Sequence, residues 1–205
     1  MGYRYDIRHL SPQAQSIIRA RDEEEEQLKS QSISTSTSRA RTSVHPISIF
    51  MRLGINPSVG INGISTLDIY KEFCSKNNSV WFSTDSLAYG IAKKQQKEFI
   101  NAIQKGHIVF IYFVIGKKGG GENEIGFRAE VTDIQSNNVG LKSPDTSLTP
   151  TEWINDTKKI WIKIRNLKEY TQLSVSDFVV VRSYNVLADS IKDSQYHFGY
   201  IQKKT

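Results

Sequence analysis

The segment from Ile108 to Ile115 constrains the fold more than any other part of the chain. It is an almost continuous apolar run of β-branched and aromatic residues. A run of this length and composition is typical of a strand that is buried on both faces. The sequence therefore predicts a sheet in which this segment is a central strand.

Other segments supply neighbours for that strand. Five further strands are predicted where apolar residues alternate with polar ones or form short runs, at 47–52, 80–83, 126–134, 160–165 and 196–201. Residues 178–181 fit either a short strand or the end of a helix. Two helices are expected, at 67–75 after Thr66 and at 86–105 after Thr84 or Asp85. We expect an α+β domain: a curved or barrel-like mixed sheet of about six strands, with two or three helices outside.

The first 46 residues differ in composition from the rest. Residues 30–43 contain nine Ser or Thr in fourteen positions and show no apolar periodicity. Such a segment buries too little surface to offset its chain entropy. We predict that 1–46 is a low-complexity, disordered tail with a possible short helix at 12–29, open to protein partners, and that 47–205 is the folded domain.

Composition limits the compartment and the partners. Residues 47–205 carry 20 Lys and Arg against 15 Asp and Glu, a mildly basic balance that is compatible with a polyanionic partner. Cys74 is the one cysteine, so a disulfide framework and a Cys-rich metal site are excluded, and a reducing, intracellular location is expected. The sequence has no apolar run long enough for a membrane span, so no membrane partner is expected.

The sequence lacks the common motifs that carry catalysis or bind cofactors. The histidines at 9, 45, 107 and 197 are scattered, without the spacing of metal ligands. The glycines at 119–121 are not followed by the Lys-Ser/Thr of a phosphate-binding loop, and no nucleophile elbow is present. We expect a protein that is not an enzyme, with no metal and no cofactor.

Two of the three tryptophans stand in unusual places. Trp81 ends a short apolar run just before an expected helix cap, and Trp153 lies in a polar loop between Pro150 and Asp156. An aromatic pair built from a strand end and a loop suits the stacking of a single base. The alternative is that both indoles are ordinary core residues, and spacing alone does not decide between these readings.

The order of segments from about residue 47 to 201 resembles the YTH domains, which read N6-methyladenosine in RNA, and the related EVE domains of the PUA-like superfamily. The specific similarities are Ser79-Val80-Trp81-Phe82-Ser83-Thr84, preceded by Asp68, and Ser190-Ile191-Lys192-Asp193-Ser194-Gln195. The hairpin Val109 to Val131 and the strand Lys159 to Leu167 match in a more general way. The spacing from Asp68 to Trp81 is longer than usual, and Lys192 replaces an arginine.

This resemblance implies a site as well as a fold. Trp81 and Trp153 would be the walls of an aromatic cage, with Leu148 or Ile154 as a third wall. Asp68 would face the edge of the base, and groups at Ser83 and Thr84 would read its amine. Phosphates would be held by further cations, namely Arg52, Lys93, Lys94 and Lys192.

Three functions follow as hypotheses. The first is binding of single-stranded RNA that carries N6-methyladenosine. The second is an EVE-type module that binds N6-methyladenine or a modified cytosine in DNA within a restriction or defence system. The third is a protein-interaction domain that does not bind nucleic acid.

Overall fold

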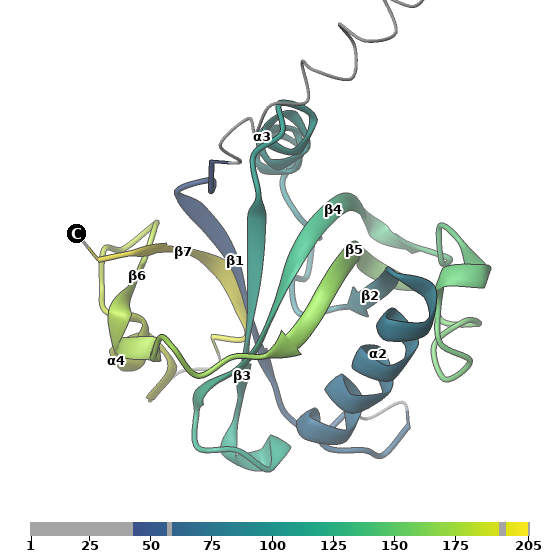
Figure 1. Ribbon diagram of the computed structural model, residues 1–205, viewed down its shortest axis with the longest axis horizontal. Coiled ribbons are helices and arrows are strands. Elements are labelled where there is room, and N and C mark those ends of the chain that lie inside the picture. The colour runs from purple at the N-terminus through teal and green to yellow at the C-terminus, as the bar shows by residue number, and fades with distance from the viewer. Residues whose placement is uncertain (1–42, 57–58, 193–195, 205) are drawn as a thin grey trace, which may run out of the picture. The chain divides into compact units, whose positions relative to one another are not determined.

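The computed structural model describes residues 43–56, 59–192 and 196–204. This part of the chain forms one mixed sheet of seven strands with three α-helices (Figure 1). The strands are β1 (Ile47–Leu53), β2 (Val80–Thr84), β3 (Val109–Ile115), β4 (Glu124–Leu141), β5 (Lys158–Glu169), β6 (Phe178–Val180) and β7 (Phe198–Lys203). The helices are α2 (Gly63–Asn77), α3 (Lys93–Gln104) and α4 (Leu187–Lys192).

The predicted buried strand lies at the centre of the sheet. The strand order is β2-β5-β4-β3-β1-β7-β6, which places β3 fourth of seven. β3 pairs with β1 in parallel and with β4 in antiparallel orientation. The α+β class is therefore confirmed, and the run of apolar residues in β3 is explained by cover on both faces.

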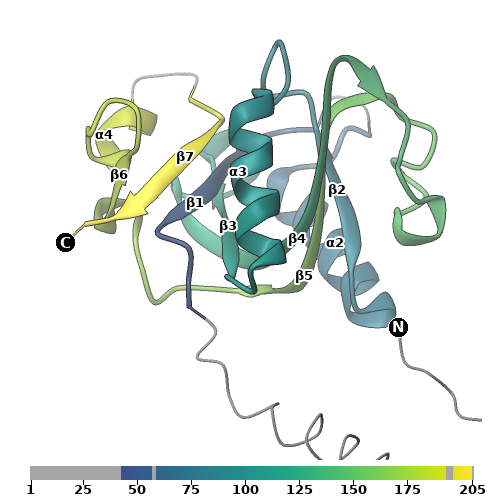
Figure 2. The same cartoon turned by 90° about the horizontal axis from the view of Figure 1, so that it is seen from above.

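The expectation of a barrel-like sheet was wrong. In the described chain β2 pairs with β5 alone, and the short β6 pairs with β7, so the two edge strands do not meet. Figures 1 and 2 show α2 beside β2 and β5 at one end of the sheet and α4 beside β6 at the other. The sheet is therefore open.

Alternation along the central strands divides the core in two. On β1, Ile49, Met51 and Leu53 face the side on which α2 and α3 pack, and they join the larger cluster of buried residues. Phe50 faces the other side, where Leu187 and Ile191 of α4 pack with residues of β6 and β7. A strand presents successive side chains to opposite faces, so this pattern follows directly from the sequence.

Helix α2 begins four residues earlier than predicted. The Asn62 side chain accepts a hydrogen bond from the N–H of Ser65 at 2.8 Å, which caps the helix at Gly63. The helix ends where Asn78 adopts a left-handed conformation, with φ of 61°. The expected boundaries at 67 and 75 lie within this helix, because Asn62 caps it in place of Thr66 and the chain leaves the helix only at Asn78.

The prediction of a helix over 86–105 was wrong in its first part. Residues 85–92 form an irregular segment, and α3 starts at Lys93. The Thr84 hydroxyl accepts from the N–H of Ser86, as a cap would, but Asp85 turns away to accept the main-chain N–H of Lys159. Gly90, with φ of 70°, then prevents a helix from forming before Ala92.

Two further segments have more regular structure than the sequence predicted. β4 continues through the expected polar connection to Leu141, and α4 covers the start of the expected loop at 190–195. At the other end of the domain, His45 N–H donates to the carbonyl of Ile108, so pairing with this region starts before β1. The predicted tail lies mostly outside the described residues, which begin at Ser43.

In the three described ranges, none of the helices combines the length and the apolar character required to cross a membrane.

Candidate functional site

A cavity with a volume of about 840 Å³ lies where the ends of several elements meet. This volume falls in the range of about 300–1,000 Å³ that is typical of small-molecule sites. On one side, the lining residues come from the end of β1 and the loop after it, and from the loop after β3. Others come from α2 and the end of β2. The rest come from the start of β5 and from the end of α4 and the segment after it.

An aromatic floor, defined here as Tyr70, Phe82 and Trp153, closes one side of the cavity. Tyr70 and Trp153 are stacked, with ring centroids 4.4 Å apart and an angle of 11° between the planes. Tyr70 and Phe82 contact at 5.0 Å in a tilted arrangement. Each of the three residues is only 1% exposed, so the floor is well packed before any ligand arrives.

The direction of side chains on β2 decides which aromatic residue reaches this floor. Val80 and Phe82 point to the side of α2, whereas Trp81, between them, points to the opposite face. Trp81 is 3% exposed and pairs across the sheet with Lys163, whose Nζ is 6.0 Å from the indole centroid. Its Nε1 has no hydrogen-bond partner among the described residues. Trp81 therefore has the environment of a core residue.

The Tyr70 hydroxyl points to the end of β2. It lies 3.5 Å from Oγ of Ser83, at the long limit of a hydrogen bond. Burial raises the pKa of Tyr70, and this effect exceeds the lowering caused by the hydrogen bonds at Ser83. Tyr70 is therefore neutral at physiological pH, and the floor carries no negative charge.

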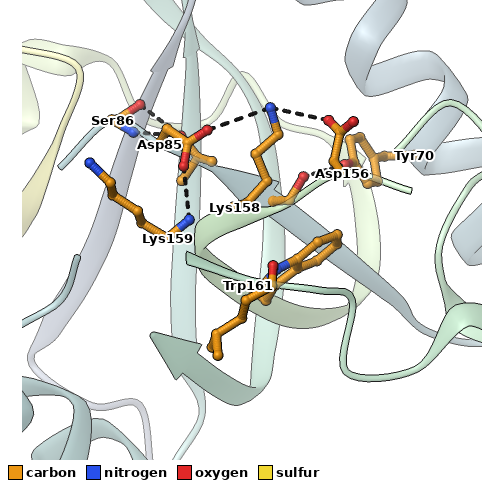
Figure 3. A network of polar contacts seen from close by, with 10 residues as sticks. Tyr70, Asp85, Ser86, Asp156, Lys158, Lys159 and Trp161 are labelled. Atoms are coloured by element: carbon orange, nitrogen blue, oxygen red, sulfur yellow. Dashed lines mark hydrogen bonds and ion pairs between the residues drawn. The ribbon is translucent and has the colours of Figure 1, made fainter. Parts of the chain in front are cut away.

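Above the floor, Lys158 lies between two carboxylates (Figure 3). Its Nζ is 3.1 Å from Oδ2 of Asp156 and 3.5 Å from Oδ2 of Asp85. Only 15% of the Lys158 side chain is exposed, whereas 47% of the Asp85 side chain is exposed. Asp85 also accepts the N–H of Lys159 at 2.8 Å. These bonds fix one ammonium group and one accessible carboxylate at the end of β2.

The rest of the rim is cationic. Arg52 donates to Oδ1 of Asn123 at 2.8 Å and to the carbonyl of Ile191 at 3.1 Å, which fixes the guanidinium between β1 and α4. Among the described lining residues, the cationic rim is Arg52, Lys117, Lys118, Lys158 and Lys192, and Asp85 is the one carboxylate. A concave site lined mainly by one sign of charge attracts a ligand of the opposite sign.

The structure brings some of the predicted site residues together. The predicted residues that line the cavity are Arg52, Ser83, Thr84, Trp153 and Lys192. They come from segments far apart in the sequence, so this grouping is a result of the tertiary fold.

The other predicted residues do not line the cavity. Trp81 lies on the other face of β2, and Asp68 is exposed on α2. Lys93 and Lys94 are exposed at the start of α3. Half-buried Leu148 and Ile154 lie in the connection between β4 and β5. Trp81 and Trp153 were expected to face each other across a gap one base thick, but in the described structure Tyr70 stacks directly on Trp153 and leaves no such gap between the two rings.

The aromatic and cationic lining residues that were not predicted as site residues are Tyr70, Phe82, Lys117, Lys118 and Lys158. The sequence did contain information about Phe82. Successive side chains of a strand point to opposite faces, so Trp81 and Phe82 cannot both face the cavity. Lys117 and Lys118 stand in a glycine-rich loop after a buried strand, but nothing local shows what that loop lies against. Tyr70 and Lys158 had no distinguishing signal in the sequence.

Within the described residues, no cluster of His, Cys, Asp and Glu side chains is arranged to hold a metal ion. The cavity can accept a flat apolar group against its floor and an anion at its rim. Comparison with known protein families, with curated proteins and with solved structures finds no match for this chain.

Proposed function

We propose that this protein is a non-catalytic reader that holds one unstacked base of a nucleic acid in the cavity. Our first candidate for the ligand is N6-methyladenosine in single-stranded RNA. The base would lie against the aromatic floor, and the phosphates beside it would contact the cationic rim. Contacts between a base and aromatic side chains contribute about 1–3 kcal/mol per base.

One observation carries this proposal: the aromatic floor and five cationic side chains share a single cavity. A nucleotide is both a flat ring and an anion, so it matches both parts at once. Protein interfaces are enriched in aromatic residues and arginine but depleted in lysine, whereas four of these five cations are lysines.

The resemblance to YTH and EVE domains supports the same class of ligand and suggests that the open sheet is a PUA-like one. The geometry requires a different set of wall residues from the one expected. Phe82 takes the position on β2 that was expected for Trp81, and Trp153 remains a wall. For the base edge, Asp85 replaces Asp68 as the carboxylate, beside Ser83 and Thr84.

Recognition of the methyl group needs more than stacking, because every base has a flat face. The apolar lining includes Met51 and Leu53 next to the aromatic floor. A methyl group placed against such a surface gains hydrophobic contact, and its loss lowers affinity by about 1–3 kcal/mol in a tight pocket. The accessible Asp85 carboxylate is an acceptor for an exocyclic N–H, which adenine and cytosine both offer.

The test is a titration of the full chain with four oligonucleotides of one sequence: RNA and DNA, each with and without a single N6-methyladenine. We expect the methylated RNA to bind about five- to 150-fold more tightly than the plain RNA, which corresponds to about 1–3 kcal/mol. Preference for methylated DNA over methylated RNA would instead indicate the EVE-type module. Absence of binding to all four would refute the proposal and favour a protein-interaction domain.

A second prediction concerns Lys192, an exposed member of the cationic rim. Lys192→Ala is expected to lower the affinity for methylated and plain oligonucleotides by the same factor, because a phosphate contact does not distinguish one base from another. The slope of log K against log salt should become shallower by about 0.7 for a single strand. Isothermal titration at several salt concentrations measures both quantities.

Lys105→Ala is the matched control, because this exposed lysine at the end of α3 does not line the cavity. It should change neither the affinity nor the salt slope. A Lys192→Ala variant that lost only the methylated ligand would contradict the role in phosphate binding.

A further inference from the structure

Tyr89 is the most exposed of the large apolar side chains in the described part of the chain, at 85%. It lies in the segment between β2 and α3, which projects from the top of the view in Figure 2. An aromatic ring in this position contributes little to the core. Its exposed face is available to a planar group of a ligand.

The backbone that carries Tyr89 is fixed on both sides. The carbonyl of Ala88 accepts a hydrogen bond from Nζ of Lys159 at 2.7 Å, and the N–H of Ile91 donates a hydrogen bond to Oγ of Ser136 at 2.8 Å. Gly90 packs so closely on Ser136 that a Cβ there would collide with the serine hydroxyl. An ordered backbone removes the entropy cost of ordering the loop when a ligand binds, and only the side chain remains to be ordered.

Tyr89 is also close to the cavity along the chain. Ser86 lines the cavity, and three residues span at most about 11 Å, so the Cα of Tyr89 lies within about 11 Å of the Cα of a lining residue. Lys93 and Lys94 follow on the same segment, exposed at the start of α3. The segment that leaves the cavity at Ser86 thus carries one exposed aromatic ring and then two exposed cations.

We propose that Tyr89 is a stacking platform for the base adjacent to the one in the cavity, and that Lys93 and Lys94 contact the phosphates beyond it. The ligand is then a single-stranded polynucleotide, because both bases must be unstacked from a duplex to reach these surfaces. This inference rests on the proposed function and names the form of the ligand. It also gives Lys93 and Lys94 a role outside the cavity.

The experiment compares Tyr89→Ala, Tyr89→Phe and the wild type on two probes: the nucleoside N6-methyladenosine, and an oligoribonucleotide that contains it. Wild type should bind the oligonucleotide more tightly than the nucleoside. Tyr89→Ala should lower the affinity for the oligonucleotide by about five- to 150-fold, the range for loss of one base–aromatic stack. It should leave the affinity for the nucleoside unchanged. Tyr89→Phe should retain the affinity, because stacking needs the ring and not the hydroxyl.

Tyr184→Ala is the matched control, since Tyr184 is 73% exposed and lies between β6 and α4, outside the cavity lining. It should bind both probes as the wild type does. An oligonucleotide affinity that is unchanged in Tyr89→Ala, or lowered equally in Tyr184→Ala, overturns this inference alone. Failure of the wild type to bind either probe overturns the proposed function together with it.

Discussion

Trp81→Ala is expected to lower the free energy of unfolding by about 3–5 kcal/mol, the usual cost of replacing a buried Trp by Ala. The indole is 3% exposed, so its removal would leave a large void among the residues that pack around it. Denaturant unfolding followed by circular dichroism measures this change. Molecules that remain folded should keep their affinity for the methylated oligonucleotide, because Trp81 does not line the cavity.

Phenylalanine substitutions at two tryptophans sharpen this test. Nε1 of Trp161 donates to the carbonyl of Leu141 at 2.9 Å, whereas Nε1 of Trp81 has no partner in the described chain. Trp161→Phe should therefore cost about 0.5–1.5 kcal/mol more than Trp81→Phe, through the lost hydrogen bond. If Trp81→Ala left stability unchanged but removed the preference for the methyl group, Trp81 would be a cage residue and our assignment to the core would be wrong.

Trp153→Ala is expected to lower the affinity for the methylated oligonucleotide by about five- to 150-fold, because one wall of the cavity is lost. It should also lower the free energy of unfolding by about 3–5 kcal/mol, since Trp153 is 1% exposed and stacks on Tyr70. Trp153→Phe keeps an aromatic ring in the stack, so it should lower both the affinity and the free energy of unfolding by less than Trp153→Ala does. Fluorescence anisotropy at a temperature where each variant is folded measures the affinity.

Loss of stability alone must be separated from loss of the wall. Trp161→Ala provides this separation, because Trp161 is fully buried but does not line the cavity. It should be destabilised to a similar degree and still bind the oligonucleotide once folded. Equal losses of affinity in the two variants would show that Trp153 acts through stability and does not contact the base.

The elements were easier to predict than their ends. Alternation and apolar runs identify β1, β3, β5 and β7, because period-2 patterns are local and directly visible in a sequence. The start of α3 was missed, because Asp85 has two possible partners. A helix cap would use it within the segment, but in the folded chain the N–H of Lys159 uses it instead. Competition of this kind between a local and a distant partner cannot be resolved from local sequence.

The candidate site shows the same division. Ser83 and Thr84 were predicted from a resemblance to a family motif, and Trp153 was predicted from an indole in an otherwise polar loop. The choice of Phe82 over Trp81 depends on which face of β2 packs against α2, a question that the pairing of β2 with β5 answers. Reversing the assignment of inner and outer faces would have exchanged the two residues, because a shift of one position moves every side chain to the opposite face.

The sequence by itself determined the α+β class, the central position of β3 and the mildly basic character of the domain, since these depend on composition and on short-range periodicity. Only the tertiary structure decided that Tyr70, Lys158 and the loop with Lys117 and Lys118 share one cavity with Trp153. These residues are brought together by strand order and register, which arise from packing between segments that are distant in the chain. No local pattern encodes that convergence, and it is the convergence that gives the cavity its aromatic floor and cationic rim.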